Sequence, residues 1–550
     1  MKKNSFVEGT VIATAIIIIV KLLGMLYVIP FYKIVGDQGG ALYSYGYNIY
    51  LLFLGISSAG LPDAIAKIIS EYNALGYDDA KQRAYKIGRN LILGMAVISF
   101  FLLMVFAEEI GAFIIGDLKD GNTIQDVAFV VRCVAPSVLL IPFLSITKGY
   151  LQGHKFISAS SMSQLIEQVF RITIILIGSY LVIKVFKGGI SLAVGIAMTG
   201  AFFGGLFAYL YLKYAMNKNK EELKLNDNVK KDKITNKEIT KKILTYALPF
   251  IIINIVSNIY NSTDQILVLR TLEYLKLDTK TVEFCASAIS TWSPKICMVI
   301  NAMAMGMTMS LVPTIVSAYA KKDFKEVEDK INKSLSMIFF ISIPLSIGIS
   351  FLSESVWTAF YGYNKIGGTI LKLMAFSALF GNLYMIVSTI CQSLNKYSAV
   401  YKVSVTGFML NALLDVPIML LYNKIGLPVY LGSITASIIG YSTSVVIGLI
   451  LLRKENKYSY KKAVTMALKS LIPALSMLFV LILLSMVVSF SVTGRLTAVL
   501  NIAINAVVGG IVYVFISIKV GLLDEIIGRH NVAKIVRKLT FGLIKIKDAS

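Results

Sequence analysis

Charged residues are scarce in this chain. They make up 15% of its 550 residues, whereas hydrophobic residues reach 56% and the mean hydropathy is +0.73. A soluble domain carries roughly 25% charged residues, so the composition excludes a soluble globular protein. Apolar runs of about 20 residues, each long enough to cross the hydrocarbon core of a bilayer, recur from end to end. The fold class predicted is therefore an all-α polytopic membrane protein.

Cysteine and histidine are also rare. The four cysteines have neither the spacing of metal ligands nor that of a disulfide framework, and the two histidines, His154 and His530, fall in a loop and in the tail. These residues indicate neither a metal centre nor a bound cofactor. The two longest outer loops expected, about 108–126 and 270–285, carry no convincing catalytic constellation, so an enzyme is not expected.

Basic residues exceed acidic ones, and the net charge is +23. In a soluble protein this excess would suggest nucleic acid as a partner. Cytoplasmic loops of membrane proteins collect Lys and Arg, however, and no nucleic acid is expected here. With fourteen spans and a cytoplasmic N-terminus, the inside segments carry 37 of the 54 Lys and Arg residues and the outside segments carry 10, so both termini are predicted to be cytoplasmic. The spans expected are 8–31, 45–69, 87–107, 127–147, 157–183, 190–212, 244–269, 286–318, 334–353, 367–393, 402–421, 429–452, 464–489 and 497–518.

An internal repeat divides the chain. The segment "IISEY" (68–72) resembles "IVSAY" (315–319), and "YLQGHKF" (150–156) resembles "CQSLNKY" (391–397). We predict two pseudo-symmetric six-helix lobes, a plan typical of transporters that work by alternating access. The expected parts are an N-terminal lobe (1–213), a cytoplasmic linker (214–243), a C-terminal lobe (244–453), two further helices (464–518) and a tail (522–547). The tail is predicted to be an amphipathic helix on the inner leaflet, with a solvated tail as the alternative.

Three basic residues fall deep within the predicted spans, where a charge is costly. Arg171 lies one helical turn after Glu167, so the two side chains are expected to pair, in either a structural or a substrate-binding role. Lys21, in "IIIIVKLLGMLYVIPFY" (16–32), and Lys295, in "STWSPKICM" (290–298), have no such partner in the sequence. They are predicted to belong to opposite lobes and to face a shared cleft. Two cations there suit an anionic substrate such as a phosphate or pyrophosphate.

Two acidic residues share a depth in the predicted spans. Asp264 and Asp415 both lie near the outer end of a helix, and Asn411 is one turn before Asp415 on the same face. Carboxylate and amide oxygens suit a hard cation, with Na⁺ as the obvious candidate, or a proton relay. A hydrogen-bonded cluster between helices is the alternative.

Three segments carry a resemblance to a known family. The stretches "VKLLGMLYVIPF", "GGALYSYGYNIYLLFL" and "SQLIEQVFRI", with fourteen helices in two lobes, resemble the multidrug/oligosaccharidyl-lipid/polysaccharide exporter superfamily. Within it the chain is similar to the MurJ-type lipid II flippases, in the Gram-positive branch that includes the spore-cortex protein of stage V sporulation. The resemblance covers essentially the whole chain and implies a location in the bacterial plasma membrane.

The resemblance also implies roles for individual residues. Lys21 stands in the place of an arginine in the family's central cationic cavity, and Lys295 falls at or beside the arginine of helix eight. Tyr27 and Val28 stand where the family has an Arg-Asp pair, so that part of its pattern is absent. The candidate substrate-binding residues are Lys21, Tyr27, Glu167, Arg171 and Lys295. The residues that match the sodium site of some relatives are Asp264, Asn411, Asp415 and, more loosely, Ser437.

The function expected is that of a flippase. It would move an undecaprenyl-pyrophosphate-linked glycolipid, with lipid II of peptidoglycan biosynthesis as the first candidate, from the inner to the outer leaflet. Its partners would be the lipid-linked oligosaccharide, membrane lipids and the cell-wall synthesis machinery, with Na⁺ or H⁺ as the coupling ion. The alternatives are an exporter of teichoic acid or other polysaccharide units, a drug/cation antiporter and, less favoured, a membrane glycosyltransferase.

Overall fold

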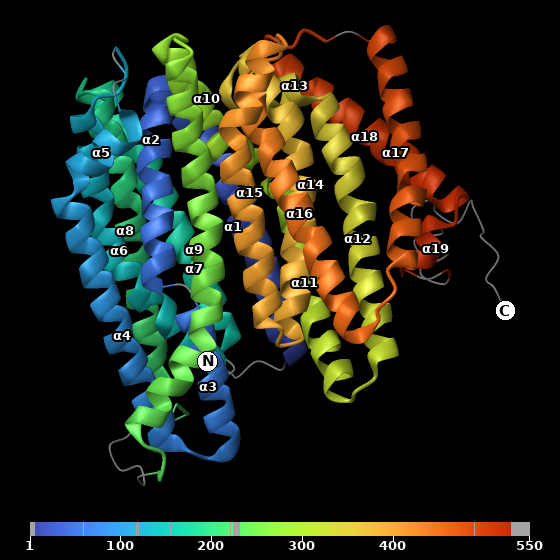
Figure 1. Cartoon of the computed structure of the whole chain (residues 1–550). Coiled ribbons are helices and arrows are strands. Elements are labelled where there is room, and N and C mark those ends of the chain that lie inside the picture. The colour runs from blue at the N-terminus through green and yellow to red at the C-terminus, as the bar shows by residue number, and fades with distance from the viewer. Residues whose placement is uncertain are drawn as a thin grey trace. The chain divides into compact units, whose positions relative to one another are not determined.

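The computed structural model describes residues 6–58, 60–116, 118, 120–154, 156–220, 222–223, 232–488, 490–527 and 529. Every regular element within these residues is a helix, and none is a strand (Figure 1). Eleven helical stretches of the described residues are long and apolar enough to cross a membrane. The prediction of an all-helical polytopic protein is confirmed, whereas the count of fourteen spans stays a prediction.

The helices form two compact units. The N-terminal unit comprises Met1–Ile296 with Ala412–Ser433, and the C-terminal unit comprises Cys297–Asn411 with Ile434–Ser550. The limits of the predicted lobes and linker stay predictions.

In chain order the first elements are α1 (Phe6–Leu26), α2 (Val28–Ser58), α3 (Leu61–Leu75), α4 (Asp78–Val105), α5 (Ala107–Ile115), α6 (Ile124–Gly153), α7 (Ile157–Thr173), the π-helical turns η1 (Ile174–Gly178) and η2 (Leu181–Val185), α8 (Ile190–Lys218), α9 (Asn236–Tyr274), α10 (Thr279–Ser287) and η3 (Ala288–Trp292). They are followed by α11 (Ser293–Ala320), α12 (Phe324–Phe351), α13 (Ser353–Tyr361), α14 (Lys365–Ser393), α15 (Tyr397–Lys424), α16 (Leu431–Asn456), α17 (Lys461–Val487), α18 (Arg495–Lys519) and α19 (Leu522–Ile527).

The first two helices differ from the spans predicted at 8–31 and 45–69. The expected loop between them is helical, because α2 runs from Val28 to Ser58 and is only kinked at Gly36, whose φ of 67° favours glycine. Polar side chains of α2 find partners on other helices. Asn48 donates to the side-chain oxygen of Gln265 over 2.9 Å, and Gln265 donates to Ser44 over 2.7 Å. Buried polar groups satisfied in this way can remain in a helix.

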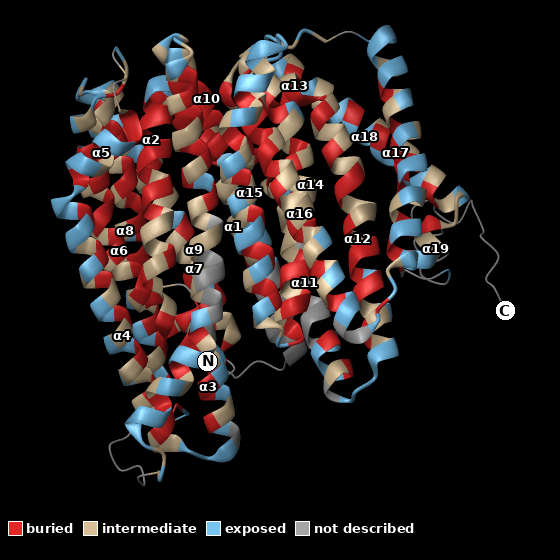
Figure 2. Cartoon of the chain, viewed as in Figure 1, coloured by how far each residue is buried: buried red, intermediate tan, exposed pale blue. Residues whose placement is uncertain are grey.

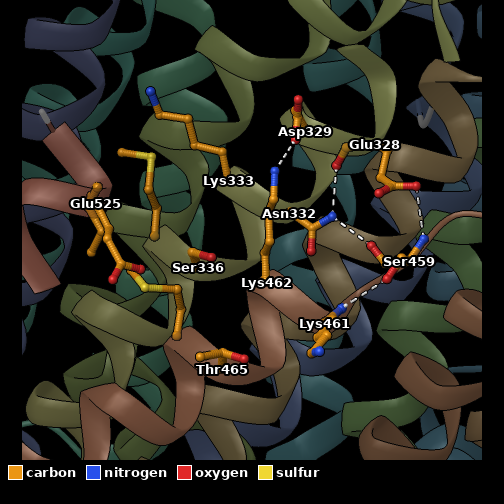
Figure 3. A pocket seen from close by; sticks show the side chains of 13 residues that line it. Glu328, Asp329, Asn332, Lys333, Ser336, Ser459, Lys461, Lys462, Thr465 and Glu525 are labelled. Atoms are coloured by element: carbon orange, nitrogen blue, oxygen red, sulfur yellow. Dashed lines mark hydrogen bonds and ion pairs between the residues drawn. The ribbon is translucent and has the colours of Figure 1, made fainter. Parts of the chain in front are cut away.

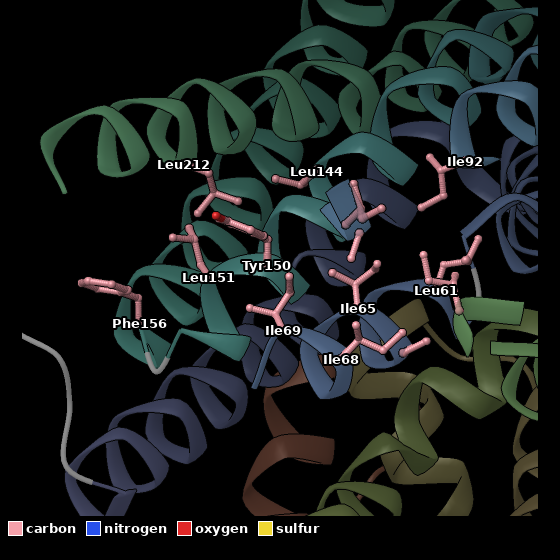
Figure 4. Close-up of a cluster of buried hydrophobic side chains, with 14 of the residues drawn as sticks. Leu61, Ile65, Ile68, Ile69, Ile92, Leu144, Tyr150, Leu151, Phe156 and Leu212 are labelled. Atoms are coloured by element: carbon pink, nitrogen blue, oxygen red, sulfur yellow. The ribbon is translucent and has the colours of Figure 1, made fainter. Parts of the chain in front are cut away.

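The core of the N-terminal unit at the α3 end lies among α3, α4, α6 and α8, with α9 packed against α3 and α4. Figure 4 shows Ile65, Ile68 and Ile69 of α3 in one cluster with Leu144 and Tyr150 of α6. All five side chains are almost completely buried. Because lipid tails are as apolar as these side chains, close van der Waals packing within the cluster holds α3 in position against the longer helices.

Helices α3 and α6 approach so closely that a glycine is required at the contact. A Cβ atom on Gly149 would lie 2.9 Å from the backbone Cα and C of Pro62 and closer still to its carbonyl oxygen. We expect Gly149→Ala to destabilise the folded protein by about 1–3 kcal/mol, because backbone cannot yield as a side chain can. Thermal unfolding of the purified protein measures the effect. The control is Gly94→Ala on exposed α4 surface, where a Cβ meets nothing within 4 Å; equal behaviour of the two variants would contradict the prediction.

In the C-terminal unit α12 packs against both α14 and α17, and α17 packs against α18. Tyr513 of α18 donates to the carbonyl oxygen of Phe340 over 2.6 Å, beside buried Met477 and Leu481 of α17. Figure 2 shows exposed residues along α17, and Phe479 among them is 62% exposed. An apolar side chain exposed on a membrane-spanning helix is suited to contact lipid. Of the predicted amphipathic tail only α19 and Arg529 are described, and the rest of 522–547 lies outside the described residues.

Candidate functional site

Lys295 lies in the first turn of α11 inside a cage of aromatic side chains. It is 7% exposed, and its Nζ atom donates to the hydroxyl of Tyr27 over 2.9 Å. The same atom lies 4.7 Å from the ring centre of Trp292, 4.8 Å from Tyr43, 5.0 Å from Tyr47 and 5.1 Å from Tyr27. The Tyr27 hydroxyl is also hydrogen-bonded to that of Tyr43, at 3.1 Å. We call the four aromatic residues around Lys295 (Tyr27, Tyr43, Tyr47 and Trp292) the aromatic cage.

The aromatic cage attracts the ammonium group of Lys295 without cancelling its charge. Cation–π contacts contribute from about 0.5 to 2 kcal/mol each through the ring quadrupole. No carboxylate of the described residues forms an ion pair with Lys295. The positive charge therefore stays available for an anion, and the cage sets the position from which the side chain can reach one.

Arg171 belongs to a triad of charged residues rather than to a simple pair. On α7 it donates to Glu167 over 2.5 Å, as the i,i+4 spacing predicts, and Lys148 of α6 binds the other oxygen of Glu167 at 2.9 Å. The three side chains are 13–21% exposed. The triad keeps one net positive charge, and the buried Nε atom of Arg171 has no hydrogen-bond partner in the described structure. Arg171 also interacts electrostatically with Lys295.

Lys21 is half-buried on α1, which packs against α7. It has no hydrogen-bond or ion-pair partner among the residues that the structure describes. The contact between the two helices is close, since a Cβ on Gly24, one turn after Lys21, would lie 3.3 Å from the side-chain nitrogen of Gln168. The sequence prediction placed Lys21 and Lys295 in opposite lobes, whereas the structure groups both in the N-terminal unit.

The two predicted acidic residues meet in the N-terminal unit. The carboxyl groups of Asp264 on α9 and Asp415 on α15 lie against each other, and Ser433 of α16 lies beside Asp415. Asp415 is fully buried, and neither of its oxygens makes a hydrogen bond of normal geometry to a described residue. Buried oxygens of this kind are the ligands that a hard cation or a proton would take. Asn411, also fully buried, is one turn from Asp415 on α15, and Ser437, 6% exposed, is one turn after Ser433 on α16; both belong to the other unit.

The C-terminal unit contains a charged groove of about 680 Å³ between α12, α17 and α19 (Figure 3). Lys462 pairs with Asp329 at 2.7 Å, and Lys469 pairs with Glu525. Asn332 donates to the carbonyl oxygen of Ser459 over 2.8 Å. Asp329 and Glu525 are paired, and Glu328 accepts from the backbone N–H of Ser459. Because Asn332 also fastens the loop before α17 to α12, we assign this groove a structural role and no ligand.

Sequence reasoning missed the partners of both basic sites. Tyr43, Tyr47 and Trp292 had no role in the prediction, and Lys148 was counted only among the loop charges. One signal was present, because Trp292 is one of two tryptophans in the chain and lies three residues before Lys295.

Known proteins match the chain over nearly its whole length. The polysaccharide biosynthesis protein family matches residues 6–317, and the MatE family matches 286–416. The lipid II flippase MurJ of Bacillus subtilis (strain 168) is 30% identical over 540 residues, which cover 96% of this chain and 97% of that protein. Stage V sporulation protein B of the same organism is 23% identical over 376 residues, 68% of this chain and 70% of that protein. A solved structure described as lipid II flippase MurJ in an inward closed conformation superposes with a TM-score of 0.66, at 18% identity, over 92% of this chain and 98% of the other.

The fold and these likenesses first define a class, the multi-pass membrane proteins of the MurJ and MatE structural type. More closely, the chain belongs to the polysaccharide biosynthesis protein family and is a homologue of MurJ. The resemblance predicted from the three quoted segments is confirmed.

Proposed function

We propose that this protein is a flippase for an undecaprenyl-pyrophosphate-linked glycolipid, with lipid II as the substrate, and that it is not an enzyme. The observation that carries the proposal is the buried, carboxylate-free ammonium of Lys295, which interacts electrostatically with Arg171 of the net-positive triad. A pyrophosphate is the part of such a lipid that needs cations, and charge-assisted hydrogen bonds to it are roughly twice as strong as neutral ones. The similarity to MurJ over 96% of the chain supports the same substrate.

The proposed substrate site comprises Lys21, Tyr27, Arg171 and Lys295, with Glu167 as the residue that holds Arg171 in place. The pyrophosphate would bind the ammonium groups and the free Nε of Arg171, while the lipid tail stays in the bilayer. Alternating access would then expose the head group on the outer side. We propose a plasma-membrane location with both termini in the cytoplasm, where the basic loops attract anionic lipid carriers, and cell-wall synthesis enzymes as partners.

Depletion rescue tests this function. Expressed in cells that lack their own lipid II flippase, the wild-type chain is expected to restore lipid II at the outer surface, detected by its accessibility to an externally added reagent. Lys21→Ala is expected to restore at least about tenfold less, because it removes a charge-assisted contact to the pyrophosphate. Lys33→Ala, outside the deep spans, serves as the control. If the wild-type chain does not restore lipid II at the outer surface, the proposed function is wrong. If Lys21→Ala restores it fully, Lys21 is not part of the substrate site.

The acid pair is proposed to couple transport to a cation, with Asp264 and Asp415 as its carboxylate ligands. We expect Asp415→Asn to abolish any stimulation of flipping by a Na⁺ gradient while leaving the protein folded, since the amide keeps the shape and removes the charge. Flipping of fluorescent lipid II in proteoliposomes, with K⁺ replacing Na⁺, is the measurement. Na⁺ stimulation that survives in the variant would contradict coupling at Asp415; a wild type that responds to H⁺ instead would identify the proton as the coupling ion.

Two other transport functions can be compared with the proposal by the charge of the substrate that each would bind. An exporter of teichoic acid or other polysaccharide units would use the same cations, so only substrate competition in proteoliposomes separates it from the proposal. A drug/cation antiporter is disfavoured because a cationic drug would be repelled by Lys21, Lys295 and the net charge of the Arg171 triad.

A further inference from the structure

The C-terminal unit has a second cavity, of about 410 Å³, at the ends of α12 and α17 that adjoin α13 and α18. We call it the α13–α18 pocket. Its volume falls in the range of small-molecule sites, roughly 300–1,000 Å³. Nine of its fourteen lining residues are polar, and seven of these carry an uncharged hydroxyl or amide group. This lining differs from that of the proposed substrate site, where cations dominate, and suits a ligand rich in hydroxyl groups.

Asn505 of α18 lies in the wall of the α13–α18 pocket with one hydrogen-bonding atom unused. It is 4% exposed, and its Nδ2 atom donates to the backbone oxygen and to the Oδ1 atom of Asn501, over 2.8 and 2.7 Å. These two acceptors fix the orientation of the amide. Its Oδ1 atom is buried without a partner in the described structure. A buried acceptor left unpaired costs about 1–3 kcal/mol, which a ligand hydroxyl would recover.

The rest of the α13–α18 pocket is built to hold a neutral ligand. Asn501 donates to Ser355 of α13 over 2.8 Å, which ties the two walls together. Glu354 and Lys372 contribute one charge of each sign, and neither has a hydrogen-bond or ion-pair partner among the described residues. Opposite charges that remain free can bind hydroxyl groups as acceptor and donor without selecting an anion. Phe490 supplies an apolar wall, as the carbon face of a sugar ring requires.

We propose that the α13–α18 pocket is a glycan-binding site that receives the sugar portion of the transported lipid. The choice of occupant rests on the proposed function, since a glycolipid flippase handles a carbohydrate whose charge is carried elsewhere, by its pyrophosphate. In the predicted orientation the pocket lies at the outer ends of α12 and α17, where a translocated head group arrives. Binding there favours the released, outward product over its return.

Calorimetric titration of the purified full chain in nanodiscs tests the pocket directly. The probe is N,N′-diacetylchitobiose, a soluble disaccharide of N-acetylglucosamine. We expect the wild type to bind it and Asn505→Leu to bind at least about fivefold more weakly, the effect of losing one neutral hydrogen bond. Glu354→Gln, which keeps the side-chain shape, is expected to show a loss of the same size and remains informative if Asn505→Leu does not fold. Lys33→Ala, at an exposed position of the other unit, is the matched control and is expected to bind like the wild type.

Three results would overturn the glycan site. They are an absence of binding by the wild type, wild-type affinity in both pocket variants, and equal binding of glycerol, which would indicate a phospholipid head group instead. The outcome is separable from that of the proposed function. If the protein binds chitobiose but does not rescue flippase-depleted cells, the proposed flippase function is wrong and the glycan-binding pocket stands. If it rescues the cells but does not bind chitobiose, the flippase function stands and the glycan-binding pocket is wrong.

Discussion

Lys295→Met is expected to slow lipid II flipping by about tenfold or more while leaving the fold at least as stable as the wild type. The methionine side chain has a similar length and no charge, so the variant removes a buried cation that has no carboxylate partner. Replacing an incompletely compensated buried charge by an apolar group is often neutral or stabilising. The loss of a charge-assisted contact to the pyrophosphate lowers the rate by about tenfold or more. Flipping in proteoliposomes and thermal unfolding of the same preparation measure the two effects.

The control for Lys295→Met is Lys424→Met, at the exposed end of α15, which is expected to change neither quantity. Lys295→Arg is expected to retain only part of the activity, because the planar guanidinium does not fit a cage formed around an ammonium group. If Lys295→Met unfolds but remains active per folded molecule, Lys295 is a structural residue and the proposed site loses its central cation.

Glu167→Leu is expected to destabilise the protein by about 3–5 kcal/mol. It leaves Lys148 and Arg171 facing each other without the carboxylate that binds both, at 2.9 and 2.5 Å. Breaking a buried ion pair from one side costs this much because the remaining charge is poorly solvated. The drop in unfolding temperature of the purified protein, or the loss of folded protein from the membrane, measures it.

A triple variant separates charge balance from substrate binding at the same place. When Glu167→Leu is combined with Lys148→Met and Arg171→Met, no unpaired charge remains, and stability is expected to return toward that of the wild type. Flipping is expected to stay lost if Arg171 binds substrate. Glu326→Leu, which removes a long 3.8 Å pair on the exposed start of α12, is the control and should change stability by less than about 1 kcal/mol. A similar cost for Glu326→Leu and Glu167→Leu would speak against a buried triad.

The sequence predicts the parts of the molecule that depend on nearby residues. Apolar runs define the helical class, and the spacing of Glu167 and Arg171 predicts their ion pair, because both depend on neighbours within one turn. The helical course of α2 was not predictable from its polar stretch. Ser44 falls in the loop expected between the first two spans, and its partners on α9 and η3, with the partner of Asn48 on α9, satisfy these polar groups within a helix.

The candidate site depends even more on contacts between residues that are far apart in the sequence. Lys295 is recognisable in the sequence as a deep cation, but its hydrogen-bond partner Tyr27 is 268 residues away along the chain. No local sequence pattern predicts such a contact. The π-helical turn η3 that precedes α11 also has no sequence signature, since a π-turn differs from an α-helix by a single hydrogen-bond register.

Trp292 has a consequence for how the protein can be observed. Its indole ring lies 4.7 Å from the ammonium of Lys295, and the chain has only one other tryptophan, Trp357 on α13. A nearby cation alters the emission of an indole, so the intrinsic fluorescence of this protein carries a signal from the side chain on which its proposed function depends. With Trp357 replaced by phenylalanine, the protein contains its own optical probe of whether Lys295 is held in the aromatic cage or drawn out of it.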